Sequence, residues 1–223
     1  MLHLGSIGKT SIDVDFSFFM LLGLFVILNY DESRGIEYAL IWIPILFLSV
    51  LIHELAHAAA IAIFGFGASS IILGGMGGLT ANEHMRNARP WQGFVISVAG
   101  PVSSFVLWFL ASMAMGLPIA RTDRFFAVFL PLFALANAWW GIFNLIPVPP
   151  LDGGHATRDF FRMFLDERKA FIIAIWIAII VGGAVTILGL INRQLFLTIY
   201  IGWFSYMSWQ RWQYFREHGI PGD

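Results

Sequence analysis

The chain of 223 residues has no cysteine and few charged residues. Without cysteine, disulfide bonds and thiolate metal sites are excluded, so any metal ion must be bound by His, Asp or Glu. Charged residues make up 12% of the chain, about half the share usual in soluble domains, and 58% of the chain is hydrophobic. A formal net charge of −1 gives no basic field that would attract nucleic acid. The composition therefore predicts an integral membrane protein that does not bind nucleic acid.

Apolar runs divide the chain into candidate membrane-spanning helices, each of which needs about 20 mostly apolar residues. No small-residue cleavage site follows the first run, so we expect that it is not a cleaved signal peptide. No internal repeat or soluble domain separates the runs, which predicts a single domain over residues 1–223. The expected fold is an all-α polytopic membrane protein with about six transmembrane helices and a small membrane-associated β element. The six spans are expected at about 16–30, 38–64, 93–116, 125–146, 170–191 and 195–213.

Lys and Arg residues are distributed unequally between the two sides of these six spans. The side that holds both termini carries nine of the 13 Lys and Arg residues, and the other side carries four. Because cytoplasmic loops are enriched in Lys and Arg, we expect both termini in the cytoplasm. The first group is Lys9, Arg86, Arg89, Arg158, Arg162, Arg168, Lys169, Arg211 and Arg216; the second is Arg34, Arg121, Arg124 and Arg193.

The second apolar run contains the sequence His-Glu-Leu-Ala-His at residues 53–57. On a helix, His53 and His57 lie four positions apart on one face, so they can bind one metal ion together. Glu54 lies next to them and could take a proton from a water molecule that attacks a carbonyl group. Ionisable groups in a membrane span cost at least about 2.5 kcal/mol and usually serve a function. The pattern therefore indicates a metal-dependent hydrolase rather than a buried polar packing cluster.

A catalytic zinc ion needs a third protein ligand besides the two histidines. Asp152 follows the fourth span, which crosses the membrane in the same direction as the second, so both reach the cytoplasmic side. It also stands between a proline-rich turn and two glycines, a setting suited to a ligand on irregular backbone. The possible third ligands on the cytoplasmic side are Glu83, His84, Asp152, His155 and Asp159.

Two loops have unusual compositions. Residues 65–84 are poor in charge and include four glycines within Gly74–Gly78. Because bare backbone amides cannot face lipid, we expect a hairpin or re-entrant loop packed on helices, to which the N-terminal segment adds a strand. A plain flexible loop is the alternative. In the second loop, three prolines within Pro147–Pro150 end a helix, Asp152 and two glycines turn the chain, and residues 156–169 are expected to form an amphipathic surface helix.

Three features resemble the site-2 proteases, a family of intramembrane zinc metalloproteases: the sequences HELAH, GGMGG and FNLIPVPPLDGG. The resemblance implies that His53, His57 and Asp152 bind one Zn²⁺ per chain and that Glu54 is the general base. It further implies that Asn144 holds the substrate backbone or the developing oxyanion. The glycine loop would act as an edge that pairs with an unwound substrate, through Gly74, Gly75, Met76, Gly77 and Gly78.

The resemblance also has implications for partners and location. The substrate would be a single-span, membrane-anchored regulatory protein in the lipid bilayer, cleaved in the cytoplasmic half of the cell membrane. The printed sequence resembles a minimal form, with neither a PDZ-type peptide-binding domain nor a nucleotide-sensing domain.

Two asparagines in the fourth apolar run need partners, because an amide in hydrocarbon is costly unless it is hydrogen-bonded. Asn144 can donate to an oxyanion or bond to a neighbouring helix. For Asn137 we expect the packing role.

Other functions are compatible with parts of the pattern. A metal-ion transporter or sensor could use the same His and Asp residues, but it would be expected to show polar positions along a pathway and often repeated halves. Another class of membrane zinc protease acts on lipidated peptides and usually has a glutamate as third ligand, for which only Glu83, Glu167 and Glu217 lie downstream. A catalytically inactive scaffold is disfavoured by the intact motif residues.

Overall fold

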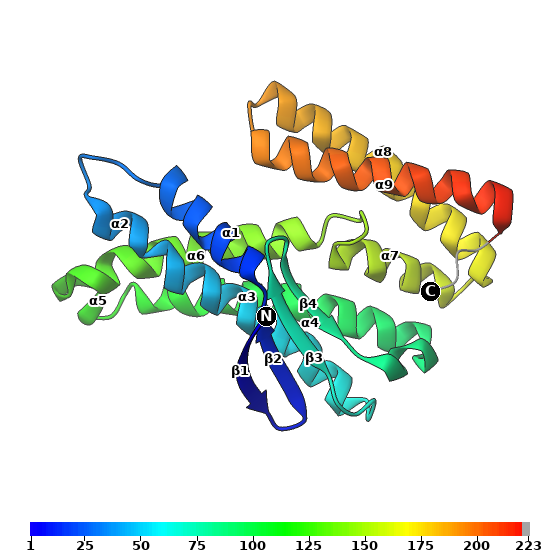
Figure 1. Ribbon diagram of the computed structural model, residues 1–223, viewed down its shortest axis with the longest axis horizontal. Coiled ribbons are helices and arrows are strands. Elements are labelled where there is room, and N and C mark those ends of the chain that lie inside the picture. Colours follow the sequence, from blue (N-terminus) through cyan, green and yellow to red (C-terminus); the bar gives the residue numbers. More distant parts are fainter. Residues whose placement is uncertain (220–223) are drawn as a thin grey trace. The chain divides into compact units, whose positions relative to one another are not determined.

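The computed structural model describes residues 1–219, apart from the side chain of Arg86, and is mostly helical with a small sheet (Figure 1). The single domain predicted over residues 1–223 includes residues 220–223, which lie outside the described residues. The strands are β1 (Leu2–Ile7), β2 (Thr10–Val14), β3 (Ser70–Gly74) and β4 (Gly77–Ala81). The helices are α1 (Phe16–Leu28), α2 (Ile36–Leu40), α3 (Trp42–Ile63), α4 (Pro90–Ala114), α5 (Ile119–Thr122), α6 (Arg124–Asn144), α7 (Asp152–Arg162), α8 (Glu167–Ile191) and α9 (Leu195–His218), with a 3-10 turn, η1 (Glu83–Asn87), before α4.

Four helical segments are long and apolar enough to cross a membrane, which indicates an integral membrane protein. They are Ile36–Ile63, Pro90–Ala114, Arg124–Asn144 and Glu167–Ile191. These segments correspond to the second, third, fourth and fifth predicted spans. The first predicted span is the apolar helix α1, which has only 13 residues. The sixth is α9, which has 24 residues but is not among the helices apolar enough to span.

The chain forms two compact units. Unit 1 comprises Met1–His84 and Ala99–Gly141, and unit 2 comprises Met85–Val98 and Ile142–Asp223. Helices α4 and α6 therefore contribute residues to both units.

The sheet of unit 1 consists of two antiparallel hairpins joined along their inner strands, in the order β1-β2-β3-β4. The inner strands β2 and β3 are parallel, with Ile12 opposite Ile71, and their buried side chains pack with α1 and α3. The N-terminal segment thus supplies two strands, where one was expected. The glycine loop forms the turn of the β3–β4 hairpin, with Gly77 at a φ of +114° that favours glycine. The predicted β element is confirmed, and β1 and β4 lie at its two edges.

A buried polar contact joins α3 and α6 within unit 1. The side chain of Asn137 is fully buried, and its Nδ2 donates to Ser49 Oγ at 2.9 Å and to the Phe133 carbonyl at 2.8 Å. These bonds satisfy the amide NH2 group within the helix pair, so Asn137 has the packing role expected from the sequence.

In unit 2, α8 and α9 lie side by side (Figure 1) and share two apolar clusters. The proline-rich loop is part of this packing, because the fully buried Val148 contacts residues of both helices. The helices are joined by a short turn after Ile191, where α8 ends.

The bounds of 156–169 predicted for the amphipathic helix are wrong at both ends. Helix α7 begins at Asp152 and ends at Arg162. At its start, a Cβ on Gly153 would lie 2.3 Å from the Leu145 carbonyl oxygen, so only glycine lets the proline-rich loop fold directly onto a helix here. At its end, Asp166 caps the next helix by accepting a bond from the Lys169 amide at 3.0 Å. Residues 163–166 therefore form a connection, and Lys169 belongs to α8.

Candidate metal and catalytic site

His53 and His57 lie one turn apart on the buried face of α3, with ring centroids 4.9 Å apart. Their Nε2 atoms face a common point next to α4. A Cβ on Gly100 would lie 2.3 Å from His57 Nε2 and 2.5 Å from His53 Nε2. Glycine at this position therefore leaves open the space in which two imidazole nitrogens could share one ion.

The other ring nitrogen of His53 is held by α4. Its Nδ1 lies 3.0 Å from the Oγ of Ser104, which is fully buried. If Nδ1–H donates to this hydroxyl, the lone pair of Nε2 faces the Gly100 side, as in metal-binding histidines whose second nitrogen has a partner. The ring of Trp140 approaches His53 edge-on, with centroids 6.4 Å apart, and restricts its rotation further.

Glu54 is buried and lies directly against the edge strand β4. Its Oε2 accepts a hydrogen bond from Thr80 Oγ1 at 2.7 Å. A Cβ on Gly78 would lie 2.2 Å from Glu54 Cγ and 2.4 Å from Oε1, so the carboxylate occupies the place where any other residue would have a side chain. The expected general base is thus adjacent to a sheet edge.

Two predicted site residues belong to unit 2 and flank the proline-rich loop. Asn144 is the last residue of α6 and is buried, whereas Asp152 is the first residue of α7 and is partly buried. Gly153 and Gly154, which follow Asp152, are packed against the loop backbone. The backbone that follows Asp152 is thereby fixed by contacts within its own unit.

Among the His, Cys, Asp and Glu side chains of residues 1–219, one group of three could hold a metal ion: His53, His57 and Asp152. Two imidazole nitrogens and one carboxylate oxygen are a suitable donor set for a catalytic zinc ion, which takes three protein ligands and an open position. Of the candidates for the third ligand, Asp152 alone belongs to this group. His155 has an exposed side chain on α7.

Three residues around the site were missed from the sequence: Thr80, Gly100 and Ser104. A weak signal existed for two of them, because Gly100 and Ser104 interrupt an apolar run with small and polar residues. Which of the small residues in that run would face the histidines depends on helix packing, which the sequence does not show.

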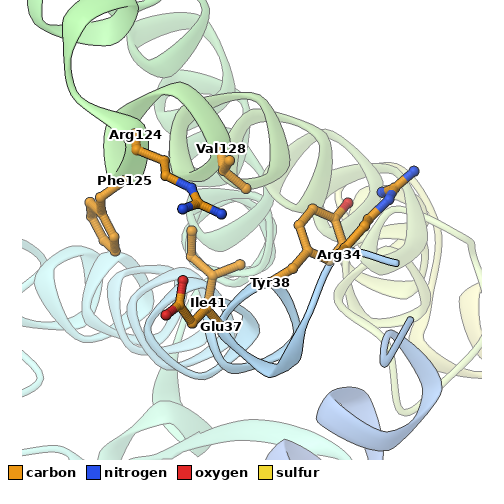
Figure 2. A pocket seen from close by; sticks show the side chains of 7 residues that line it. All are labelled: Arg34, Glu37, Tyr38, Ile41, Arg124, Phe125 and Val128. Carbon is orange, nitrogen blue, oxygen red and sulfur yellow. The ribbon is translucent and has the colours of Figure 1, made fainter. Parts of the chain in front are cut away.

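A separate cavity of about 310 Å³ lies in unit 1 at the beginnings of α2 and α6 (Figure 2). In Figure 2 the side chain of Arg124 extends across it toward Ile41. None of the predicted site residues lines this cavity, so it is distinct from the candidate site. Its lining residues are Arg34, Glu37, Tyr38, Ile41, Arg124, Phe125 and Val128.

Comparisons with known proteins agree with the donor set and with the fold. Residues 112–188 match the sequence profile of Peptidase family M50. The chain is 34% identical over 221 residues to sll0528 of Synechocystis sp., a protein named as a candidate zinc metalloprotease, and the match covers 91% of this chain. It is 28% identical over 196 residues to the zinc metalloprotease MJ0392 of Methanocaldococcus jannaschii, covering 84% of this chain.

The fold matches a solved structure, the site-2 protease from Methanocaldococcus jannaschii, with a TM-score of 0.62 over 94% of both chains at 22% identity. The chain spans about half the length of the curated relatives that it matches, 57% of the Synechocystis protein and 53% of MJ0392.

Proposed function

We propose, from the membership of this chain in peptidase family M50 of site-2 proteases, that it is a zinc endopeptidase that cleaves transmembrane segments of membrane-anchored proteins. This membership favours proteolysis over the metal-ion transporter that could use the same ligands. The observation that carries the proposal is the position of Glu54, which lies beside a histidine pair with converging Nε2 atoms and against an edge strand.

His53, His57 and Asp152 would hold the zinc ion, which when bound supplies Lewis-acid polarisation of the scissile carbonyl and of water. Glu54 acts as the general base that takes the proton of the attacking water and later returns it to the leaving amine. The bond from Thr80 engages Oε2, which leaves Oε1 for this transfer. The amide of Asn144 donates to the substrate backbone or to the developing oxyanion.

The substrate is proposed to bind in extended form along β4. An added strand obtains its affinity from main-chain hydrogen bonds, which an edge strand can provide. Gly78 lets the Glu54 carboxylate approach the backbone of β4, and Gly77 lies against the ring of Trp140. Gly74, Gly75 and Met76 form the end and turn of the hairpin. A transmembrane helix would have to unwind before it could bind in this way.

Counted over the six spans predicted from the sequence, the excess of Lys and Arg on one side supports an orientation in the cell membrane with both termini in the cytoplasm. The active site would then lie in the cytoplasmic half of the bilayer. By the family resemblance, the substrates are single-span regulatory proteins.

The proposal is tested with the full chain purified in detergent, by measuring bound zinc and cleavage of a single-span test substrate. Replacing Glu54 by Gln should keep zinc and lower the rate of cleavage by about 10²–10⁴-fold, because the base is lost while the ligands remain. The Asp152→Ala variant should bind zinc more weakly and lose cleavage as well. Glu32→Gln, in the exposed loop before α2, is the matched control and should change neither quantity.

Wild-type rates of cleavage in Glu54→Gln would refute the mechanism. Unchanged zinc affinity in Asp152→Ala would assign the third ligand to another residue.

A further inference from the structure

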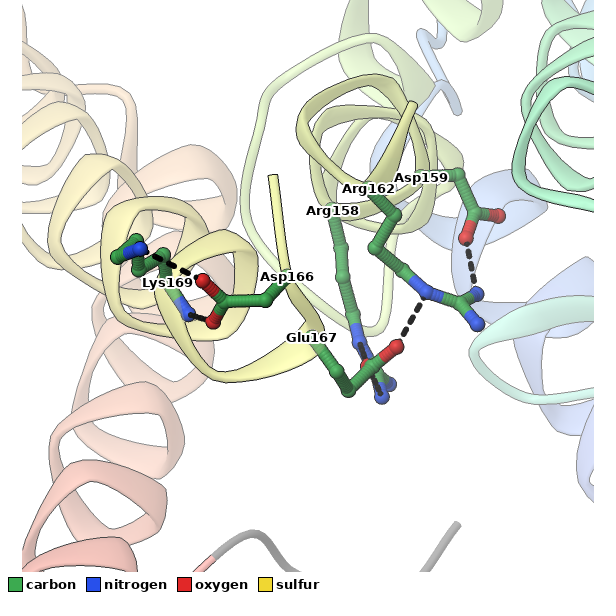
Figure 3. A network of polar contacts seen from close by, with 6 residues as sticks. All are labelled: Arg158, Asp159, Arg162, Asp166, Glu167 and Lys169. Carbon is green, nitrogen blue, oxygen red and sulfur yellow. Dashed lines mark hydrogen bonds and ion pairs between the residues drawn. The ribbon is translucent and has the colours of Figure 1, made fainter. Parts of the chain in front are cut away.

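Two ion pairs join the C-terminal end of α7 to the start of α8, and a third joins two residues within α7 (Figure 3). Glu167 accepts a hydrogen bond from Arg158 Nη2 at 2.6 Å on Oε1 and pairs with Arg162 Nε at 2.5 Å on Oε2. Arg162 also donates from Nη1 to Asp159 Oδ1 at 2.8 Å. We call Arg158, Asp159, Arg162 and Glu167 the α7–α8 latch.

The carboxylate of the latch, Glu167, stands at the capped N-terminus of α8. Glu167 is the first residue of that helix, where a negative charge is favoured by the helix dipole and the backbone is fixed by the Asp166 cap. Arg158 and Arg162 lie four positions apart on one face of α7, so both guanidinium groups reach the same carboxylate. Their side chains are only 25% and 29% exposed. Partial shielding from water makes such pairs stronger than fully exposed ones.

The same end of α7 also contacts the first part of α4, which belongs to the same unit. A Cβ on Gly93 would lie 2.2 Å from Asp159 Oδ2, so the carboxylate fills the position of the missing side chain. Next to it, the rings of Phe94 and Phe160 are 6.1 Å apart. Helix α7 is therefore attached to two other helices at the end remote from Asp152.

The length of α7 makes this attachment relevant to the metal ligand at its other end. Asp152 and Arg162 are separated by a rise of about 15 Å along the helix. A tilt of about 5° at the latch would displace Asp152 by about 1.3 Å over that length. Metal–ligand distances tolerate deviations of only about 0.2 Å.

We propose that the α7–α8 latch positions the Asp152 carboxylate for zinc binding, an inference that rests on the proposed function of Asp152. Arg158, Arg162 and Glu167 are thus positioning residues that act through the orientation of α7. Asp159 contributes by fixing Arg162 and by seating the helix on Gly93.

The test compares Arg162→Gln with Lys169→Gln in the full chain, using competition with a chelator to measure zinc affinity. Lys169 pairs with Asp166 at 2.8 Å at the same corner, but this pair belongs to α8 and its cap, and its side chains are 69% and 53% exposed. Arg162→Gln should weaken zinc binding by about tenfold, the lower limit for partners that orient metal ligands, and Lys169→Gln should leave it unchanged. Arg162→Lys, which keeps the charge, should recover most of the affinity.

A second readout does not depend on zinc. In the metal-free protein, amide hydrogen exchange at residues 152–156 should become faster in Arg162→Gln and stay unchanged in Lys169→Gln. If Arg162→Gln does not fold, Glu167→Gln removes the opposite charge of the same ion pair at nearly constant volume and tests the same latch.

A lower melting temperature with unchanged zinc affinity and unchanged exchange at residues 152–156 would overturn the inference, because it would show an ordinary stabilising contact. Absence of zinc binding in the wild type would contradict the proposed function. The exchange data would then test the latch by themselves. Faster exchange at residues 152–156 in Arg162→Gln would still support it, and unchanged exchange would overturn it.

Discussion

Replacing Gly78 by alanine tests the contact between the edge strand and Glu54. The new Cβ would lie 2.2 Å from Glu54 Cγ, whereas ordinary contacts begin at 3.4 Å, so the Glu54 side chain must move by about 1.2 Å. The side chain is flexible, so the fold should tolerate this movement. Misplacement of a catalytic group by about 1 Å can lower the rate about 100-fold, and we expect a loss of that size in kcat.

Two further glycine variants make the result specific. Alanine at Gly100 would place its Cβ 2.3 Å from His57 Nε2, so Gly100→Ala should lose zinc, while Gly78→Ala should retain it. Alanine at Gly183 of α8 meets no atom within 4 Å and should change neither zinc content nor cleavage. Zinc per chain and kcat on a single-span substrate are measured for all three.

A wild-type kcat in Gly78→Ala would refute the reasoning, because the base would then tolerate displacement. Loss of zinc in the same variant would also count against it, since the contact involves Glu54 and neither histidine.

Two other predictions concern the surroundings of the site. Asn137→Leu should lower the free energy of unfolding in detergent by about 1 kcal/mol, because the hydrogen bond to Ser49 is lost. Zinc content and kcat should not change. A lower kcat at full stability would instead place Asn137 in the catalytic site. Burial raises the pKa of the Asp159 carboxyl above its ordinary value of 3.8, against the opposing effect of Arg162. The folded state therefore binds this proton more tightly, and the resulting stabilisation is complete below 3.8 and is lost as the pH rises through the folded-state pKa. The wild type should therefore lose melting temperature relative to Asp159→Asn as the pH rises through this range. A gain relative to Asp159→Asn would contradict burial as the cause of the raised pKa.

The part of the site that follows from local spacing could be predicted from the sequence. His53, Glu54 and His57 lie within five residues of one helix, so the helical repeat alone places the histidines on one face. Asp152 could be singled out because prolines and glycines around a lone carboxylate are unusual after an apolar run. The four strongest spans could be predicted for a similar reason, since hydrophobic length is a local property.

The contacts between distant segments could not be predicted. Gly78 and Gly100 are required because Glu54 and the histidines fill the space of their missing side chains, and this depends on how β4 and α4 pack against α3. The start of α7 was misplaced because Gly153 and Gly154 suggested a turn, whereas they allow close packing of the loop onto the helix. Its end was misplaced although Asp166, at a suitable distance before an apolar run, was a recognisable cap.

The central claim is that one zinc ion per chain enables cleavage of a transmembrane substrate, and chelation followed by restoration tests it most directly. The wild-type chain is reconstituted in liposomes with a single-span substrate, and zinc per chain and cleavage are measured before chelation, after chelation and after zinc is returned. The account predicts one zinc per chain, loss of cleavage when zinc is removed, and recovery when it is returned. Cleavage that persists after zinc removal, or a chain that binds no zinc, would contradict it.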